Sequence, residues 1–340
     1  MTSFLEVEDL SVIFPTDDGE VVAANKVSYS VDLGQTLAIV GESGSGKSVS
    51  NLAVMGLHPT NRTRISGSAK LNLNSGSVNV VTATQEQVRK LRGKEMSMIF
   101  QDPMSALHPF FSIGSQIAEA WQLHNDGDKA DALAKATEML DLVGIPDPAR
   151  RVNDYPHQFS GGMRQRAMIA MALINRPSLL IADEPTTALD VTVQSQILKL
   201  LKDLQLELNM AIILITHDLG IVAEVADRVA VMYGGRVVES GNVDDIFYRP
   251  SHPYTLGLLN SVPSISSEHG HRLKAIAGQP PSLINLPSGC SFEPRCDYAK
   301  KVAGDKCKSI NPDFESVGEL HFSRCHLKIE DRNNLLKDRS

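Results

Sequence analysis

The chain has 340 residues, of which 42% are hydrophobic and 21% are charged, and its formal net charge at pH 7 is −7. This composition can bury a sizeable core, and the length predicts roughly two domains. The lack of a basic bias argues against nucleic-acid binding. No apolar run approaches the ~20 residues that a membrane span needs, and the opening residues MTSFLEVEDL lack a signal-peptide pattern. We therefore expect a cytosolic protein whose membrane role would come through partners.

The first 250 residues alternate apolar, strand-like runs with amphipathic helical stretches. Residues 27–33 alternate apolar and polar side chains, as a half-buried strand does. Residues 36–40 form a short apolar run that ends at Gly41, and a helix is expected over residues 48–57. Continuous apolar runs, typical of a mainly parallel sheet covered on both faces, follow at residues 96–100, 179–182 and 211–215.

Two longer helices are expected from apolar side chains that recur at helical spacing. One covers residues 133–143, with Gly144 as its stop, and the other covers residues 193–208. Both apolar stripes are interpreted as core packing.

The composition changes near residue 250. Just before it, residues 229–233 and 236–239 flank a Gly-Gly pair, which is typical of a β-hairpin. Residues 250–340 then hold eight of the 17 prolines and all four cysteines. We place a domain boundary there and expect a loop-rich C-terminal region with little core of its own.

Residues 41–48 read GESGSGKS and fit the phosphate-binding pattern G-x-x-x-x-G-K-[ST] at every fixed position. The glycines allow backbone N–H groups to turn around phosphate oxygens, and the helix that follows adds its N-terminal dipole. Lys47 is expected to reach the β- and γ-phosphates, and Ser48 to bind Mg²⁺. The residues expected to contact the nucleotide are Gly41, Ser43, Gly44, Gly46, Lys47 and Ser48.

Residues 179–184 read LLIADE, an apolar strand that ends in two carboxylates. Asp183 is expected beside the phosphate loop, where it can hold Mg²⁺ through water. Glu184 follows at the strand exit, which suits a base that polarises the attacking water.

His217 and Gln101 each come directly after an expected strand. The imidazole of His217 could hydrogen-bond the γ-phosphate and sense its loss. Gln101 could bind Mg²⁺ or position water. Spacing alone leaves a purely structural role open for both residues.

At FSGGMRQR, residues 159–166, the sequence resembles the signature motif of ATP-binding cassette (ABC) ATPases. The other motifs then follow in family order. GESGSGKS is similar to Walker A, Gln101 to the Q-loop glutamine, LLIADEP to Walker B with its catalytic glutamate, TALD (187–190) to the D-loop, and THD (216–218) to the switch histidine. Phe14 lies where the family places an aromatic side chain that stacks on adenine. The resemblance covers nearly the whole chain.

The resemblance also implies a head-to-tail dimer of two cassettes. Each ATP would then lie between Walker A of one cassette and the signature of the other. Ser160, Gly161 and Gly162 would contact the γ-phosphate held by the partner, because glycine permits close approach of backbone N–H groups. A paralogous partner cassette is expected, and an identical one is the alternative.

Longer segments resemble the ATPase subunits of di- and oligopeptide importers. They read QDPMSALHP, YPHQFSGGMRQR, DEPTTALDVTVQSQIL, HPYT, IAGQPPSL and CSFEPRC. Ala106 and His108 replace the hydroxyl residue and the asparagine expected of this group. Because that segment is expected near the membrane subunits, the departures bear on the partner surface and not on ATP hydrolysis.

The four cysteines are separated by five, ten and seventeen residues, which is not the C-x₂-C spacing of a zinc ribbon. Clustered cysteines in a cytosolic chain favour metal binding over disulfides. The importer resemblance implies a [4Fe–4S] cluster on Cys290, Cys296, Cys307 and Cys325, with zinc and free thiols as alternatives. His321 and His326 flank Cys325 and either support the ligands or are plain solvated side chains.

The expected fold is an α/β P-loop ABC cassette with a RecA-like core, an antiparallel β subdomain and a helical subdomain over about residues 102–165. The nucleotide-binding domain would cover residues 1–250, and a small cysteine-containing module residues 251–340. The resemblance implies an ATPase that binds ATP and Mg²⁺ and closes as a dimer, because ATP favours the closed state. Implied partners are a second ATPase subunit, two transmembrane permeases and, indirectly, an extracytoplasmic substrate-binding protein, at the cytoplasmic face of the inner membrane.

Other functions are left open. Related importers carry nickel or glutathione, and some soluble ABC ATPases act in translation or DNA repair. The soluble class typically carries two cassettes or a long coiled-coil insertion, and this sequence has neither. A catalytically inactive partner subunit is a further alternative, against which the presence of Glu184 and His217 argues.

Overall fold

The computed structural model describes residues 3–187, 189–261, 276–332 and 335. Contacts between residues divide the chain into two compact units. The first holds residues 1–30, 36–82 and 215–340, and the second holds residues 31–35 and 83–214. Within the described residues, no helix is both long and apolar enough to cross a membrane.

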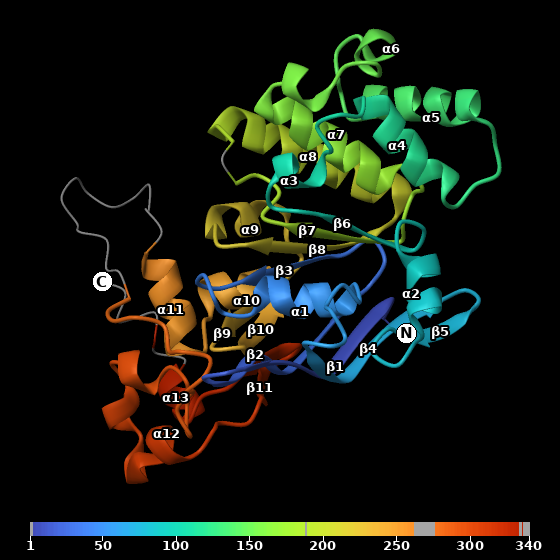
Figure 1. Ribbon diagram of the computed structural model, residues 1–340. Coiled ribbons are helices and arrows are strands. Elements are labelled where there is room, and N and C mark those ends of the chain that lie inside the picture. The colour runs from blue at the N-terminus through green and yellow to red at the C-terminus, as the bar shows by residue number, and fades with distance from the viewer. Residues whose placement is uncertain (1–2, 188, 262–275, 333–334, 336–340) are drawn as a thin grey trace. The chain divides into compact units, whose positions relative to one another are not determined.

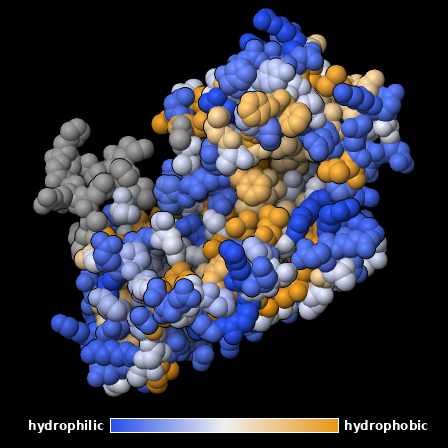
Figure 2. Space-filling view, viewed as in Figure 1, coloured by the Kyte–Doolittle hydropathy of each residue, from blue (hydrophilic) through white to orange (hydrophobic). Residues whose placement is uncertain are grey.

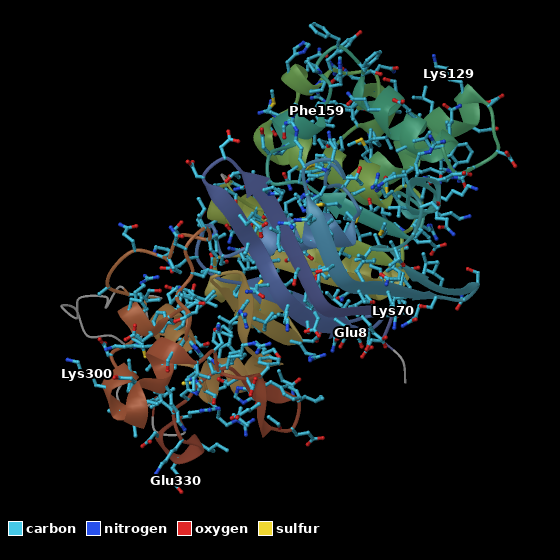
Figure 3. The ribbon with its side chains drawn as sticks, turned by 60° about the horizontal axis from the view of Figure 1, so that its bottom comes forward. Glu8, Lys70, Lys129, Phe159, Lys300 and Glu330 are labelled. Carbon is cyan, nitrogen blue, oxygen red and sulfur yellow. The ribbon has the colours of Figure 1, made fainter. Side chains whose placement is uncertain are left out.

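The first unit contains a four-stranded sheet in the order β2-β1-β4-β5. Strand β1 pairs antiparallel with β4, and β4 pairs antiparallel with β5. Glu8 on β1 and Lys70 on β4 lie on this sheet (Figure 3). It is the antiparallel β subdomain that the family resemblance implies. The strands are β1 (Leu5–Thr16), β2 (Gly19–Val31), β4 (Arg64–Leu73) and β5 (Gly76–Asn79).

A second group of strands in the first unit has the order β11-β12-β10-β9-β3. Strand β3 runs parallel to β9, and β9 forms the expected hairpin with β10 across Gly234 and Gly235, both of which have positive φ. The strands are β3 (Thr36–Val40), β9 (Arg228–Tyr233), β10 (Arg236–Asn242), β11 (Glu315–Gly318) and β12 (His321–Ser323).

Four helices accompany these strands: α1 (Lys47–Val54), α9 (Leu219–Val225), α10 (Val243–Tyr248) and α11 (Pro253–Asn260). Helix α1 ends three residues before the predicted end at Leu57. The chain leaves the helix at Met55 because Gly56 adopts a left-handed conformation with φ 62°.

The apolar core of this unit joins distant parts of the sequence. Val40 on β3 and Val231 on β9 belong to the same buried cluster as Tyr254 on α11 and Phe292. Residues after 250 therefore contribute to the core that supports β3, the strand leading into the phosphate loop. The division into domains at residue 250 stays a prediction.

The second unit contains strands in the order β8-β7-β6, with β6 and β7 parallel. They are β6 (Met96–Ile99), β7 (Leu179–Asp183) and β8 (Ala211–Thr216), and the chain enters the first unit near the end of β8. Helices α4, α5 and α7 gather beside one another in this unit (Figure 1). Its helices are α2 (Gln85–Leu91), α3 (Pro103–Ala106), α4 (Ile113–Gln122), α5 (Lys129–Leu142), α6 (Pro148–Arg151), α7 (Gly161–Leu173) and α8 (Val191–Leu208), with the 3₁₀ turn η1 (Pro156–Gln158).

Apart from α11, β11 and β12, the described residues of the C-terminal region form short turns and short helices, as its proline content predicts. Lys300 and Glu330 mark it in Figure 3. Its elements are the 3₁₀ turns η2 (Glu293–Arg295), η3 (Ala299–Lys301) and η4 (Ala303–Asp305) and the short helices α12 (Lys306–Ser309) and α13 (Ile329–Arg332).

Candidate functional site: phosphate loop, paired carboxylates and cysteine cavity

The phosphate loop lies in the first unit between β3 and α1, and two of its glycines are irreplaceable on steric grounds. A Cβ atom on Gly41 would lie 2.2 Å from the carbonyl oxygen of Met232, and one on Gly46 would lie 2.2 Å from that of Ala23. Gly44 has open space around it but a φ of 77°, which side chains rarely adopt. The loop is thus pressed against neighbouring backbone at both ends and open at its tip.

Lys47 lies folded back over this loop. Its ammonium nitrogen donates to the carbonyl oxygens of Gly41 and Glu42 over 2.8 and 3.0 Å. The side chain is 7% exposed, while Ser43 and Gly44 at the tip are exposed. The positive charge is therefore already placed within the loop, and Ser48 follows in the first turn of α1.

Phe14 lies in β1 of the same unit and is partly buried. Its ring meets the ring of His58 edge-on, with centroids 5.4 Å apart, and His58 Nε2 is 2.8 Å from the carbonyl oxygen of Val49 on α1. Phe14 is thereby linked through His58 to the helix that follows the phosphate loop. Its stacking on adenine stays a prediction.

The second unit holds the carboxylates at the end of β7. Asp183 is buried, and Glu184 has the left-handed backbone conformation with φ 46°, which is uncommon outside glycine and concentrates at functional sites. Gln101 Nε2 donates to Glu184 Oε2 over 3.0 Å, and Thr187 Oγ1 donates to the same oxygen over 2.8 Å. The structure thus brings together Gln101 and Glu184, which the sequence only predicted separately.

The signature residues lie at the N-terminus of α7. Ser160 is the N-cap, and its Oγ accepts from the backbone N–H of Met163 over 3.3 Å. Ser160 and Gly161 are exposed. The first residues of this 13-residue helix are therefore exposed, and a helix N-terminus carries the positive end of the dipole, which favours anions.

His217 lies in the first unit, directly after β8, and is exposed. The next residue, Asp218, caps α9 by accepting from the N–H of Gly220 over 2.8 Å, and its own N–H donates to Thr216 Oγ1 over 3.0 Å. The backbone is thereby fixed on both sides of His217. The contacts of His217 and Asp183 with nucleotide and Mg²⁺ stay predictions, as does the D-loop role of residues 187–190, in which Ala188 lies outside the described residues.

All four cysteines line one small cavity of about 10 Å³ in the C-terminal region, and all are free thiols. Burial raises the pKa of Cys290 to about 11 and the pKa values of Cys296 and Cys325 to about 12. His326 lines the same cavity, whereas His321 instead contacts the buried carboxylate of Glu239 over 2.8 Å. Among the described residues, no three or more His, Cys, Asp or Glu side chains are arranged to hold a metal ion.

Sequence reasoning missed two polar contacts near the site. Thr187 was assigned only to the D-loop segment, and its bond to Glu184 could have been found because it lies three residues after Glu184 in a turn. Arg295 pairs with Glu42 in the phosphate loop, 253 residues earlier in the chain, and no local pattern points to that contact.

Comparisons with known proteins agree with the motifs. Residues 24–187 match a family model described as ABC transporter, and residues 238–302 match one described as the C-terminal region of oligopeptide/dipeptide transporters. Among solved structures, the chain is similar to MJ0796, a bacterial ABC transporter cassette solved as a dimer. That similarity has a TM-score of 0.62 at 25% identity and covers 70% of this chain and 98% of the other.

The similarity to curated proteins extends over almost the full length. The chain is 51% identical over 329 residues to the oligopeptide transport ATP-binding protein OppD of Escherichia coli, covering 97% of this chain and 94% of that protein. It is 50% identical over 332 residues to the protein of the same name in Bacillus subtilis, covering 96% of this chain and 89% of that protein. The chain therefore belongs to the ABC transporter family and, within it, to the oligopeptide transport ATP-binding proteins.

Proposed function

We propose that this chain is the ATP-hydrolysing subunit of an importer that takes up di- and oligopeptides. The observation that carries the proposal is the near-full-length identity to oligopeptide transport ATP-binding proteins, which includes the C-terminal region as well as the cassette. The contacts around Lys47 and Glu184 supply a chemical basis for hydrolysis.

The phosphate loop would bind the nucleotide through its backbone N–H groups and Lys47. On binding, the ammonium would exchange its two carbonyl partners in the loop for the β- and γ-phosphate oxygens. Ser48, Asp183 and Gln101 would hold Mg²⁺, which when bound would offset the charge of the phosphates. Phe14 would stack on the adenine.

Glu184 would act as the base that polarises the attacking water. Gln101 and Thr187 both donate to Glu184 Oε2, so they hold the carboxylate plane in one orientation. A fixed carboxylate loses less freedom when it takes up a water molecule in line with the γ-phosphate. His217 would hydrogen-bond that phosphate.

A second ATPase subunit, expected to be a paralogue, would complete each site. The exposed N-terminus of α7, with Ser160, Gly161 and Gly162, would contact the γ-phosphate bound by the partner. Binding of ATP would then draw the two subunits together, and hydrolysis would release them.

Exposed aromatic side chains suit a contact with two transmembrane permeases. Phe110 and Phe111 are 81% and 56% exposed, and Met104 on α3 is 53% exposed. Gln116, itself buried, holds this loop through hydrogen bonds to the backbone of His108 and Phe111. Hydrophobic side chains gather on the visible face of the second unit near α3 (Figure 2). Docking there would place the chain at the cytoplasmic face of the membrane, with a substrate-binding protein acting on the other side.

The cysteine cavity is proposed to hold a [4Fe–4S] cluster, with zinc as the alternative. Four thiols that line one cavity supply the donor types of such a cluster, although as they lie they are not arranged to hold a metal ion. The cavity of about 10 Å³ has room for about one water molecule, so the thiols would have to move apart to admit the cluster. When bound, the cluster would tie distant turns of the C-terminal region together.

The proposal is tested by hydrolysis and complex formation. The purified chain should hydrolyse ATP only with Mg²⁺, and a Lys47→Ala variant should lose ATP binding. Co-expression with the proposed permease subunits should give a complex that co-purifies. Mg²⁺-dependent hydrolysis that survives Lys47→Ala would contradict the assignment of the site.

A further inference from the structure

The second residue of the phosphate loop, Glu42, is held by residues that come more than 200 positions later in the chain. Arg295 Nη1 donates to Glu42 Oε2 over 2.6 Å, and Nη2 donates to Oε1 over 3.0 Å. This is the parallel, two-bond geometry that makes arginine–carboxylate pairs strong. The backbone N–H of Glu42 also donates to the hydroxyl of Tyr254 over 2.8 Å.

Hydrogen bonds hold the Arg295 side chain in this position. Besides Glu42, its Nη1 donates to the hydroxyl of Tyr233 over 3.2 Å, its Nε to the carbonyl oxygen of Ala277 over 2.9 Å, and its Nη2 to that of Ile276 over 3.4 Å. Its side chain is 5% exposed. Every N–H group of the guanidinium has an acceptor, so the side chain has one orientation.

The negative charge of Glu42 would oppose the binding of a triphosphate by the loop. Its carboxylate lies in the loop whose backbone amides and lysine attract the phosphates, and like charges repel. The guanidinium of Arg295 neutralises that carboxylate and turns it away toward the C-terminal region. At the other end of the loop, the N–H of Gly235 donates to the carbonyl oxygen of Ser45 over 3.1 Å, so both ends are anchored.

We propose that Arg295 is a positioning residue for the phosphate loop, which it serves by neutralising and orienting Glu42, with Tyr254 fixing the Glu42 backbone. The inference rests on the proposed role of residues 41–48 as the ATP site. Cys296 directly follows Arg295, so this ion pair, together with the Glu42–Tyr254 hydrogen bond, connects the C-terminal region to the proposed nucleotide site.

The test measures the affinity of the full chain for the non-hydrolysable ATP analogue AMP-PNP. Arg295→Gln leaves Glu42 unpaired, and its Kd is expected to rise about tenfold, the size of one modest electrostatic interaction. The double variant Arg295→Gln/Glu42→Gln removes the repelling charge as well, and its Kd is expected to return to within about threefold of wild type. Arg295→Lys, which keeps a charge but not the two-bond geometry, is expected to lie between them.

Arg64→Gln is the matched control, because Arg64 forms an exposed ion pair with Glu20 in the same unit. Wild-type affinity in Arg295→Gln, or a double variant as weak as Arg295→Gln alone, would overturn the positioning role. So would loss of the thermal unfolding transition in both Arg295→Gln and Arg295→Lys, which would make Arg295 a plain folding residue. Unchanged affinity in Lys47→Ala would instead reject the proposed ATP site itself, so the two failures are distinguishable.

Discussion

Gln101 donates a hydrogen bond to Glu184, the residue directly after β7, over 3.0 Å. The two residues are 83 positions apart, and each follows a strand of the same parallel pair, β6 and β7. Parallel strands end at the same edge of a sheet, so side chains just beyond them meet. This contact places the glutamine where it orients the proposed base.

Glu184→Gln should slow ATP hydrolysis about 10²–10⁴-fold, the usual worth of a general base. The amide keeps an oxygen that can accept from Gln101 and Thr187, so the local structure should persist while the base is lost. Steady-state phosphate release and AMP-PNP affinity would be measured together. Glu138→Gln, on an exposed glutamate paired with Lys135, is the control. Near wild-type turnover in Glu184→Gln would remove Glu184 from the role.

Gly161→Asp should abolish ATP-driven association and hydrolysis while leaving the subunit folded. The nearest heavy atom to a Cβ at Gly161 is 4.0 Å away, so a Cβ causes no clash, but in the proposed dimer the added charge would face the partner's γ-phosphate. Gly161→Ala is the matched control without charge. Light scattering with ATP would measure association of the subunits, and a thermal melt would show whether the variant is folded. Equal loss of activity in both variants would point to backbone geometry instead of charge.

The stability of the chain should fall as the pH drops from about 6.5 to 3 because of His252. Burial, helped by the charge of Arg332, lowers the pKa of His252 from 6.5 to about 3. The folded state therefore binds fewer protons than the unfolded state between these values, so acid favours unfolding. Between these two pH values, one such group lowers the free energy of unfolding by about 1.4 kcal/mol for each pH unit of acidification.

Chemical denaturation at several pH values would check this slope. His252 Nδ1 accepts from the backbone N–H of Tyr254 over 3.1 Å as the N-cap of α11, and asparagine can serve the same cap without titrating. His252→Asn should make the free energy of unfolding depend less on pH, whereas His157→Asn, on an exposed histidine, should leave that dependence unchanged. An unchanged slope in His252→Asn would show that other groups set the acid limit.

Anaerobically purified protein should be brown and contain about four irons per chain if the cysteine cavity holds a [4Fe–4S] cluster. Cys296→Ser should lose the iron and expose the C-terminal region to proteolysis, because cluster binding contributes folding energy directly. Ser309→Ala, a substitution in the same region outside the cavity, is the control. Stoichiometric zinc without iron would replace the cluster with a zinc site, and four titratable thiols without metal would exclude both.

The motifs and most of the buried strands could be predicted from sequence because their signals are local. The five consecutive buried residues of β3 and the Gly-Gly turn between β9 and β10 are examples. The start of β2 was missed because residues 19–26 mix polar and apolar side chains without a strict alternation. Periodicity reports only on neighbours along the chain.

Contacts between distant loops could not be predicted in this way. Phe292 packs against Tyr233 and Tyr254, with centroids 5.2 and 5.4 Å apart, yet one aromatic residue in a turn-rich segment carries no periodic signal. The convergence of the four cysteines on one cavity was implied by family resemblance, and their spacing alone did not determine it. The pairing of Arg295 with Glu42 depends on the same packing and emerged only from the structure.

The central claim is most directly tested by ATP-driven peptide uptake. Membrane vesicles would carry this chain with the proposed permeases and second ATPase subunit, and the proposed binding protein would present a labelled oligopeptide. The account predicts accumulation that requires ATP, is lost with Glu184→Gln in this chain and persists with Glu138→Gln. Accumulation that is unaffected by Glu184→Gln, or a complex that hydrolyses ATP and takes up nickel or glutathione but no peptide, would contradict it.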